Sequence, residues 1–345
     1  MKFLKQLTET AGVPGREERV RELIKRHTAG WWDDLREDAM GNLIGYIKAA
    51  ARKRGQKEKG VVLACHIDQI GFYVRAIDEA GFLRIQPVGG FDPRNLFARR
   101  VKVLAGGGDL TGILNPATKP IHILPPDERK KIPELSEFMV DLCLPANEVK
   151  AKVRIGDPIV LEQTTVEIGQ MVTGQAMDNR IAPWVALNAI AKAKGKNSYD
   201  IWFVGSAQEE VGVRGAQVAA QHISAEVGIA IDTTLAVDTP GASKEEAITR
   251  LGDGVAIKVM DSYSISNRSL VDDFIALALK KKIKHQMEIL PLGGTDAGAL
   301  QRFGPPRRAI TLSIPTRYVH TIVETVHKED LKASVELLAA WLMGG

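Results

Sequence analysis

The stretch VVLACHI at residues 61–67 is an almost unbroken apolar run that ends close to a histidine. A continuous apolar run of this length is typical of a strand buried on both faces, as in a parallel or mixed sheet covered by helices. Three further runs of strand length are IWFVGSA at 201–207, VGIAID at 227–232 and AITLSI at 309–314. We therefore expect a mixed, largely parallel sheet flanked by helices.

Segments with helical spacing alternate with these runs. In one of them Val20, Leu23 and Ile24 recur on one face, with acidic residues early and basic residues late, as the helix dipole favours. The pattern predicts helices over residues 15–28, 178–195, 214–222, 269–283, 296–302 and 328–343. Strands that alternate with helices indicate an α/β fold.

The pattern changes between Gln69 and Gln163, where short β-type segments are separated by Gly, Pro and Asp turns. Closely spaced short strands favour a small barrel or sandwich. A chain of 345 residues also exceeds the usual size of one domain. We expect residues 1–68 and 168–345 to form one discontinuous domain, with 69–167 as an inserted β-rich domain.

Composition excludes several classes of protein. The formal charge is only +4, from 46 basic and 42 acidic residues, and the basic clusters at 52–58 and 129–131 have acidic neighbours. Solvated loops are therefore favoured over a nucleic-acid surface. No apolar run reaches the roughly 18 residues of a membrane span, and no signal peptide is visible. We expect a cytoplasmic protein that binds neither nucleic acid nor membranes.

The chain has two cysteines, Cys65 and Cys143, and neither belongs to a CxxC pair. This usage fits reduced core positions better than a disulfide framework or a structural zinc site.

Polar residues fall where the predicted strands end, and one precedes a predicted helix. In open α/β sheets, sites form at the carboxyl ends of the strands, so these side chains are expected to meet at one edge. They are His66 and Asp68 after the first run, Glu209 and Glu210 after the second, Asp232 after the third, His320 after the fourth, and Asp178 at the helix start.

Two histidines with several carboxylates make a nitrogen and oxygen ligand set that suits Zn²⁺, Co²⁺ or Mn²⁺. Carboxylates pooled at one site would also repel one another without cations. Two divalent ions that share a bridging carboxylate would satisfy this cluster.

Each residue alone has an ordinary explanation, and the prediction rests on their convergence. The spacing of His66 and Asp68 favours a ligand whose ring is oriented by a carboxylate, because residues two apart on a strand share a face. The ordinary alternatives are a buried histidine for His66, a helix N-cap for Asp178, a solvated helix start for Glu209 and Glu210, a turn residue for Asp232, and a surface histidine for His320.

The segments CHIDQIGF, QAMDNRIA, SAQEEVGVRGA, AIDTT, LGGTDAGAL and IPTRYVHT, in this order, resemble the M42 family of metallo-aminopeptidases. That family includes glutamyl and deblocking aminopeptidases and the tetrahedral peptidases. The resemblance extends nearly from end to end. It implies a peptide substrate and two divalent metal ions per subunit, Zn²⁺ or Co²⁺. The inserted domain would help to assemble dimers into a tetrahedral dodecamer.

The resemblance also implies a role for each site residue. His66 and Asp232 would bind one metal, Glu210 and His320 the other, and Asp178 would bridge both. Glu209 would be the general base, and Asp68 would orient His66. The family usually has Glu where this chain has Gln69, which puts in doubt only the charge near Asp68 and a subunit contact.

Three other functions stay open from the sequence. A carboxypeptidase or dipeptidase could use the same metals. A glycoside hydrolase is less favoured, because its two carboxyls must lie on opposite sides of the bond, about 5–9.5 Å apart. A non-catalytic assembly protein would be marked by loss of the base, and Glu209 is present. The Gly-rich turn at 293–296 is either a simple tight turn or a wall of the substrate pocket.

Overall fold

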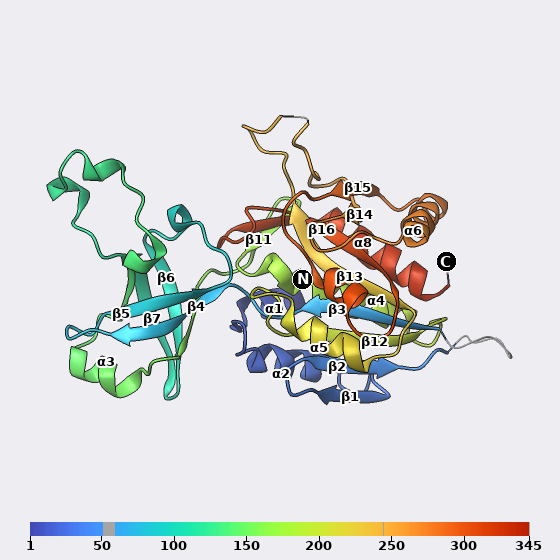
Figure 1. Cartoon of the computed structure of the whole chain (residues 1–345), viewed down its shortest axis with the longest axis horizontal. Coiled ribbons are helices and arrows are strands. Elements are labelled where there is room, and N and C mark those ends of the chain that lie inside the picture. The colour runs from blue at the N-terminus through green and yellow to red at the C-terminus, as the bar shows by residue number, and fades with distance from the viewer. Residues whose placement is uncertain (51–58, 244, 345) are drawn as a thin grey trace.

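The apolar run at 61–67 lies inside a large eleven-stranded sheet (Figure 1). In this computed structural model, β3 (Gly60–His66) pairs in parallel with β12 (Asp200–Ser206) and with β13 (Val227–Leu235). β13 in turn pairs in parallel with β16 (Arg308–Arg317). The predicted parallel centre of the sheet is thereby confirmed. The structure describes residues 1–50, 59–243 and 245–344, so the predicted basic loop at 52–58 lies outside the described residues.

Shorter strands extend this sheet on both sides. The main path runs β1-β2-β12-β3-β13-β16-β17-β11-β10, while β14 pairs with β16 and β15 pairs with β14. The added strands are β1 (Asp34–Glu37), β2 (Leu43–Ile47), β10 (Val166–Ile168), β11 (Met171–Gly174), β14 (Val255–Met260), β15 (His285–Ile289) and β17 (Glu324–His327).

Helices cover both faces of the large sheet (Figure 1). They are α1 (Lys2–Glu9), α2 (Glu18–His27), α4 (Met177–Ala193), α5 (Arg214–His222), α6 (Arg268–Lys281), α7 (Asp296–Arg302) and α8 (Lys328–Leu342). On β3, Leu63 and Cys65 join the core formed with α4 and α8, whereas Val62 and Ala64 pack in the core that contains residues of α5 and α7. This alternation explains why the strand is apolar on successive residues.

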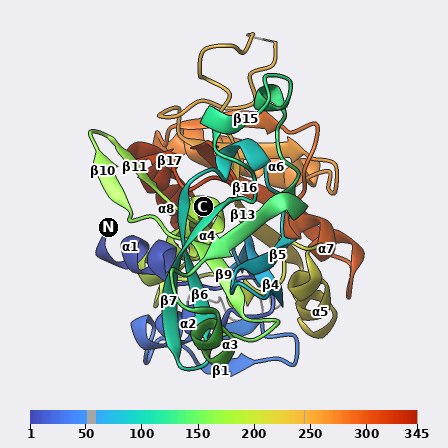
Figure 2. The same cartoon turned by 90° about the vertical axis from the view of Figure 1, so that its left-hand side faces the viewer.

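A second sheet closes into a barrel of six strands in the order β4-β5-β8-β7-β6-β9. The barrel protrudes from the large sheet and its helices (Figure 1) and faces the viewer in Figure 2. Its own core includes Phe72, Val101, Leu114 and Phe138. The predicted fold class, an α/β sheet with an inserted β-rich barrel, is confirmed. Its elements are β4 (Gly71–Ile77), β5 (Leu83–Val88), β6 (Arg99–Ala105), β7 (Gly108–Pro116), β8 (Phe138–Asp141), α3 (Ala146–Lys152) and β9 (Pro158–Leu161).

Four single 3₁₀ turns complete the barrel region: Pro93–Asn95, Ile121–Ile123, Glu128–Lys130 and Leu135–Glu137. The exact division of the chain at residues 69 and 167 stays a prediction.

The prediction for the cysteines is half right. Cys65 is buried in the core, but Cys143 is exposed. Cys143 follows β8 and has a φ of 54°, so it belongs to a turn at the surface of the barrel and not to a strand that packs inward.

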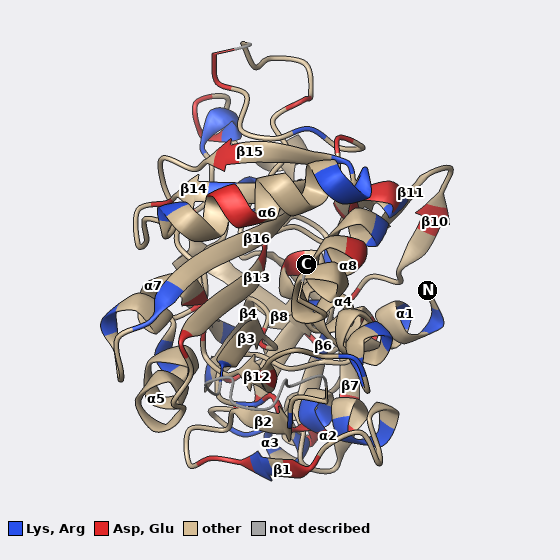
Figure 3. Ribbon diagram, turned by 90° about the vertical axis from the view of Figure 1, so that its right-hand side faces the viewer, with Lys and Arg blue, Asp and Glu red and all other residues tan. Residues whose placement is uncertain are grey.

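Charged residues of both signs share the same surface elements, as α6 illustrates (Figure 3). The predicted basic segment at 129–131 is exposed. Among the described residues, no helix is long and apolar enough to cross a membrane. The predictions of a cytoplasmic location and of no nucleic-acid partner stay predictions.

Candidate metal centre

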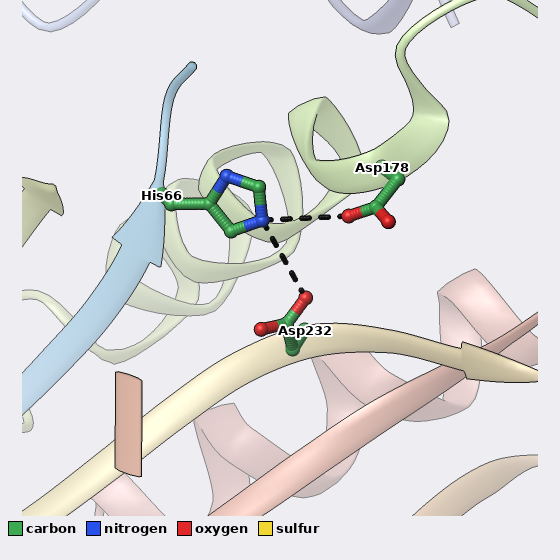
Figure 4. A group of neighbouring side chains, drawn as sticks. All are labelled: His66, Asp178 and Asp232. Carbon is green, nitrogen blue, oxygen red and sulfur yellow. Dashed lines mark ion pairs between the residues drawn. The ribbon is translucent and has the colours of Figure 1, made fainter. Parts of the chain in front are cut away.

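His66, Asp178 and Asp232 converge from three different elements (Figure 4). His66 is the last residue of β3, Asp232 lies on the neighbouring β13, and Asp178 lies at the start of α4. The Nε2 atom of His66 is 3.4 Å from Oδ1 of Asp178 and 3.8 Å from Oδ1 of Asp232. All three residues are buried. The expected meeting of side chains at this edge of the sheet is therefore observed.

A second group forms around His320, which lies between β16 and β17. Its Nε2 atom is 3.5 Å from Oδ2 of Asp178 and 3.4 Å from Oε2 of Glu210. Asp178 thus directs one carboxylate oxygen to His66 and the other to His320. The two groups are adjacent and have Asp178 in common.

The separations within both groups suit a cation better than direct hydrogen bonds. Nitrogen and oxygen atoms in ordinary hydrogen bonds lie about 2.7–3.2 Å apart. Two neighbouring ligands of a tetrahedral zinc ion, each bonded at about 2.0–2.1 Å, lie about 3.4 Å apart. The observed 3.4 and 3.5 Å separations match the second arrangement. The donor set therefore fits two divalent ions.

The negative charge of the cluster also favours the binding of cations. Asp178, Glu209, Glu210 and Asp232 gather around two imidazoles, and none of the four forms an ion pair with a described Lys or Arg. The Oε1 atom of Glu210 is buried and has no hydrogen-bond partner. Burial raises the pKa of Asp232 well above its usual value, which His66 partly opposes and Asp178 reinforces. Bound cations would remove this repulsion.

Glu209 lies beside the first group. Its Oε2 atom is 3.8 Å from Nε2 of His66. Burial raises the pKa of Glu209 well above its usual value, and although His66 lowers it, Asp232 and Glu210 add to the rise. A carboxylate with a raised pKa holds a proton more readily, as a general base must.

Asp68 links His66 to the two glutamates. Its Oδ1 atom is 3.5 Å from Nδ1 of His66, and its two oxygens accept the backbone N–H groups of Glu209 and Glu210 at 3.0 and 3.1 Å. Asp68 is fully buried. The side chain is therefore placed to hold the loop after β12 against the end of β3.

Two ordinary alternatives are not observed. Asp178 does not cap the helix: no described backbone N–H of α4 donates to its carboxylate, whose two oxygens face His66 and His320 instead. His320 is not a free surface histidine, because its Nε2 atom lies 3.4 Å from Glu210 and 3.5 Å from Asp178. Burial lowers the pKa of His320, but these two carboxylates outweigh it and raise the pKa to about 10.

Glu324, the first residue of β17, belongs to the site but was not predicted. Its Oε2 atom accepts the backbone N–H of Asp178 at 2.9 Å, and its Oε1 atom accepts that of His320 at 2.7 Å. It is buried, with 2% of its surface exposed. The sequence indicates a place for Glu324 near the site only through its position four residues after His320.

Gln69 is buried and contacts Arg180 inside the same chain. Its Oε1 atom accepts from Nη2 of Arg180 at 3.1 Å, and that guanidinium also donates to the carbonyls of Leu7, Thr10 and Gly12. Burial lowers the pKa of Arg180 to about 10. The residue that departs from the family pattern therefore meets a buried cation, and its burial within the chain speaks against the suggested subunit contact.

A cavity of about 320 Å³ opens onto both ligand groups. Gly293, Gly294 and Thr295 line it, so the Gly-rich turn forms part of its wall. The fold and the site together define a class of α/β proteins whose buried cluster of side chains fits divalent metal ions. The sequence profile of the family described as M42 glutamyl aminopeptidase matches residues 45–337, and the chain belongs to this family. It is accordingly a peptidase of the aminopeptidase type.

Relatives align over almost the whole chain. A lysyl aminopeptidase of Pyrococcus furiosus is 30% identical, with 99% of this chain and 96% of that protein covered. The aminopeptidase APDkam598 of Desulfurococcus kamchatkensis superposes with a TM-score of 0.92 and 34% identity, with 100% of this chain and 94% of that chain covered. The TET1 peptidase of Pyrococcus horikoshii can assemble into a tetrahedron or a large octahedral shell. It superposes with a TM-score of 0.87 and 31% identity, with 99% of this chain and 98% of that chain covered.

Proposed function

We propose that this chain is a dinuclear-metal aminopeptidase that removes amino acids from the N-terminus of peptides. The observation that carries the proposal is the position of Asp178, whose two oxygens face the imidazoles of two separate ligand groups. His66 and Asp232 would hold one ion, Glu210 and His320 the other, and Asp178 would bridge them. Zn²⁺ and Co²⁺ both accept this donor set.

When bound, the two ions supply Lewis acidity that polarises the scissile carbonyl and lowers the pKa of water. Glu209 takes the proton of the attacking water and returns it to the leaving amine. Asp68 keeps Glu209 in place through the backbone hydrogen bond at 3.0 Å, and it faces the ring of His66 on the side away from Asp178. The apolar part of the cavity receives the substrate.

The test of the proposal is Glu209→Gln, which keeps the shape of the side chain and removes its basicity. We expect turnover of an aminoacyl chromophore substrate to fall about 10²–10⁴-fold, while elemental analysis still finds two ions per chain. Glu128→Gln, at an exposed position of the barrel region, is the matched control and should retain activity. A Glu209→Gln enzyme with near wild-type turnover would remove Glu209 from the mechanism.

Comparison of two blocked peptides separates the aminopeptidase from its rivals. A peptide with an amidated C-terminus should be cleaved, whereas one with an acetylated N-terminus should not; the opposite result indicates a carboxypeptidase, and a need for both free ends indicates a dipeptidase. Hydrolysis of cellulose oligomers that persists in chelator would revive the glycoside hydrolase.

We propose in addition that the barrel is the dimerisation domain and that dimers assemble into a tetrahedral dodecamer. The proposal is supported by the similarity to the TET1 peptidase, which can form a tetrahedron, and by the barrel's position outside the large sheet (Figure 1). Light scattering on the full chain should give a mass of about twelve subunits. A monomer at micromolar concentration would contradict it.

A further inference from the structure

The wall of the cavity beyond the ligand groups carries several large apolar side chains. Leu235 ends β13, Tyr263 lies in the loop after β14, and Leu290 and Leu292 lie in the loop after β15. Leu235 and Leu292 are 41% and 79% exposed at this wall. Large apolar side chains grouped at an opening are typical of a surface that binds an apolar partner or ligand.

The described residues that line the cavity include no Lys or Arg, and the only acidic ones are Asp178, Glu209, Glu210 and Asp232. The proposed function engages all four: three hold the ions and one moves the proton. No charge is left over at the wall to pair with a charged side chain of a substrate. An ionised group buried there would therefore lose its hydration without compensation.

Three charged residues lie behind the wall, and they are buried and paired with one another. Nζ of Lys258 on β14 is 3.1 Å from Oε1 of Glu288 on β15 and 3.4 Å from Oδ2 of Asp261. None of the three exposes more than 3% of its surface. Between them and the cavity stands Thr234, whose hydroxyl donates to Oε1 of Glu288 at 2.5 Å. The hydroxyl hydrogen of this lining residue is thus already engaged inside the protein.

The wall is also held in a defined position. The backbone N–H of Ser262 donates to the carbonyl of Gly293 at 3.1 Å, which joins the two loops. A Cβ atom at Gly294 would come within 2.3 Å of the ring of Tyr263, so only glycine allows the ring to lie there. Arg302 stacks over the same ring, 5.5 Å from its centre. A cavity built in this way selects by shape and polarity.

We propose that this cavity binds the first side chain of the peptide and selects neutral, apolar residues over acidic and basic ones. The inference rests on the proposed aminopeptidase function and adds its substrate class. It also separates this chain from the relative named a lysyl aminopeptidase, because nothing at this wall offers a lysine ammonium a partner of its own.

The first experiment uses the metal-loaded full chain with leucyl, lysyl and glutamyl chromophore substrates. We expect kcat/KM for the leucyl substrate to exceed each of the other two at least tenfold, because the cavity cannot compensate a buried charge. Equal or greater activity on the lysyl or glutamyl substrate would overturn the substrate class and leave the aminopeptidase intact. No activity on any aminoacyl substrate would instead overturn the proposed function.

The second experiment places a charge on the wall. Leu235→Asp and, separately, the highly exposed Leu292→Asp should each raise the lysyl-to-leucyl ratio of kcat/KM about tenfold, because a carboxylate would then face the substrate's ammonium. Leu279→Asp, on the outer surface of α6 and 65% exposed, is the matched control and should leave the ratio unchanged. If both wall variants keep the wild-type ratio, these residues do not contact the first side chain.

Discussion

The carboxylate of Asp68 holds the backbone of Glu209: its Oδ1 atom accepts the N–H of Glu209 at 3.0 Å, and its Oδ2 atom accepts that of Glu210 at 3.1 Å. The same Oδ1 faces Nδ1 of His66 at 3.5 Å. One buried carboxylate therefore fixes the proposed base and two proposed ligands relative to each other. Removing an outer partner of this kind commonly costs about 10–100-fold in metal affinity or activity.

Asp68→Asn should lower kcat about 10–100-fold with little change in KM. Asparagine has one oxygen, so it can replace only one of the two acceptors, and its NH₂ group would oppose a backbone N–H or the ring of His66. Steady-state kinetics on the metal-loaded enzyme measures the effect, and elemental analysis checks the ions. Asp127→Asn, at an exposed loop position, should behave as wild type. Unchanged kcat in Asp68→Asn would assign the residue to stability alone.

Glu324→Gln should weaken metal binding about 10–100-fold. Both oxygens of Glu324 accept backbone N–H groups, one from Asp178 and one from His320, and an amide can serve only one of them. Competition against a chelator of known affinity measures the loss. The exposed Glu79→Gln is the control. Wild-type metal affinity in Glu324→Gln, with an unchanged melting temperature, would show that these hydrogen bonds do not position the ligands.

The central strands could be predicted because each is an apolar run of strand length in the sequence, and the proposed ligands could be predicted from their positions at the strand ends. β3 and β13 are long apolar runs that pair in parallel. His66 and Asp232 therefore lie at the same edge of the sheet, and this does not depend on the conformation of the loops. The position of Asp178 between His66 and His320, on which its proposed bridging role rests, could not be predicted, because it depends on non-helical angles at the start of α4. Only the family resemblance suggested that role.

The elements that were not predicted are short or locally ambiguous. β17 has only four residues, ETVH, too few for a period to be visible. No strand was therefore predicted at Glu324, and the sequence did not place this residue at the edge of the sheet. α1 has only eight residues, although Phe3, Leu4 and Leu7 are buried on one face of it. Lys258 is a charge in the middle of β14, and only its partners on other elements allow its burial.

Lys258→Met should destabilise the protein by about 3–5 kcal/mol, because it leaves Glu288 and Asp261 buried without their cation. Chemical denaturation on the metal-loaded chain measures the free energy of unfolding. Lys152→Met removes the ion pair with Glu148 on α3, where both side chains are about half exposed. That control should change the stability by less than about 1 kcal/mol. A similar, small effect in both variants would mean that the buried carboxyls are neutral.

Glu17 is a further buried carboxylate close to the site. Its Oε1 atom accepts the backbone N–H groups of Gly15 and Gln208, at 2.7 and 3.1 Å. Burial, reinforced by Asp68, raises its pKa from 4.5 to about 7 although these hydrogen bonds lower it. The folded protein therefore binds this proton more tightly than the unfolded chain does. The stabilisation from this group is complete below pH 4.5 and is lost as the pH rises through 7.

Glu17→Gln should remove that part of the pH dependence. The amide oxygen can accept from both N–H groups as Oε1 does, because a carbonyl oxygen has two lone pairs. The other oxygen of Glu17, Oε2, lies 3.6 Å from Nη1 of Arg21 and is replaced by an NH₂ group in the variant. Arg21 stays paired with Glu37, at 3.0 Å. We expect the variant to equal wild type near pH 4 and to be more stable by about 1–3 kcal/mol at pH 8. Denaturation at both pH values measures the difference, and a variant less stable than wild type at pH 8 would mean that the ionised carboxylate is itself stabilising.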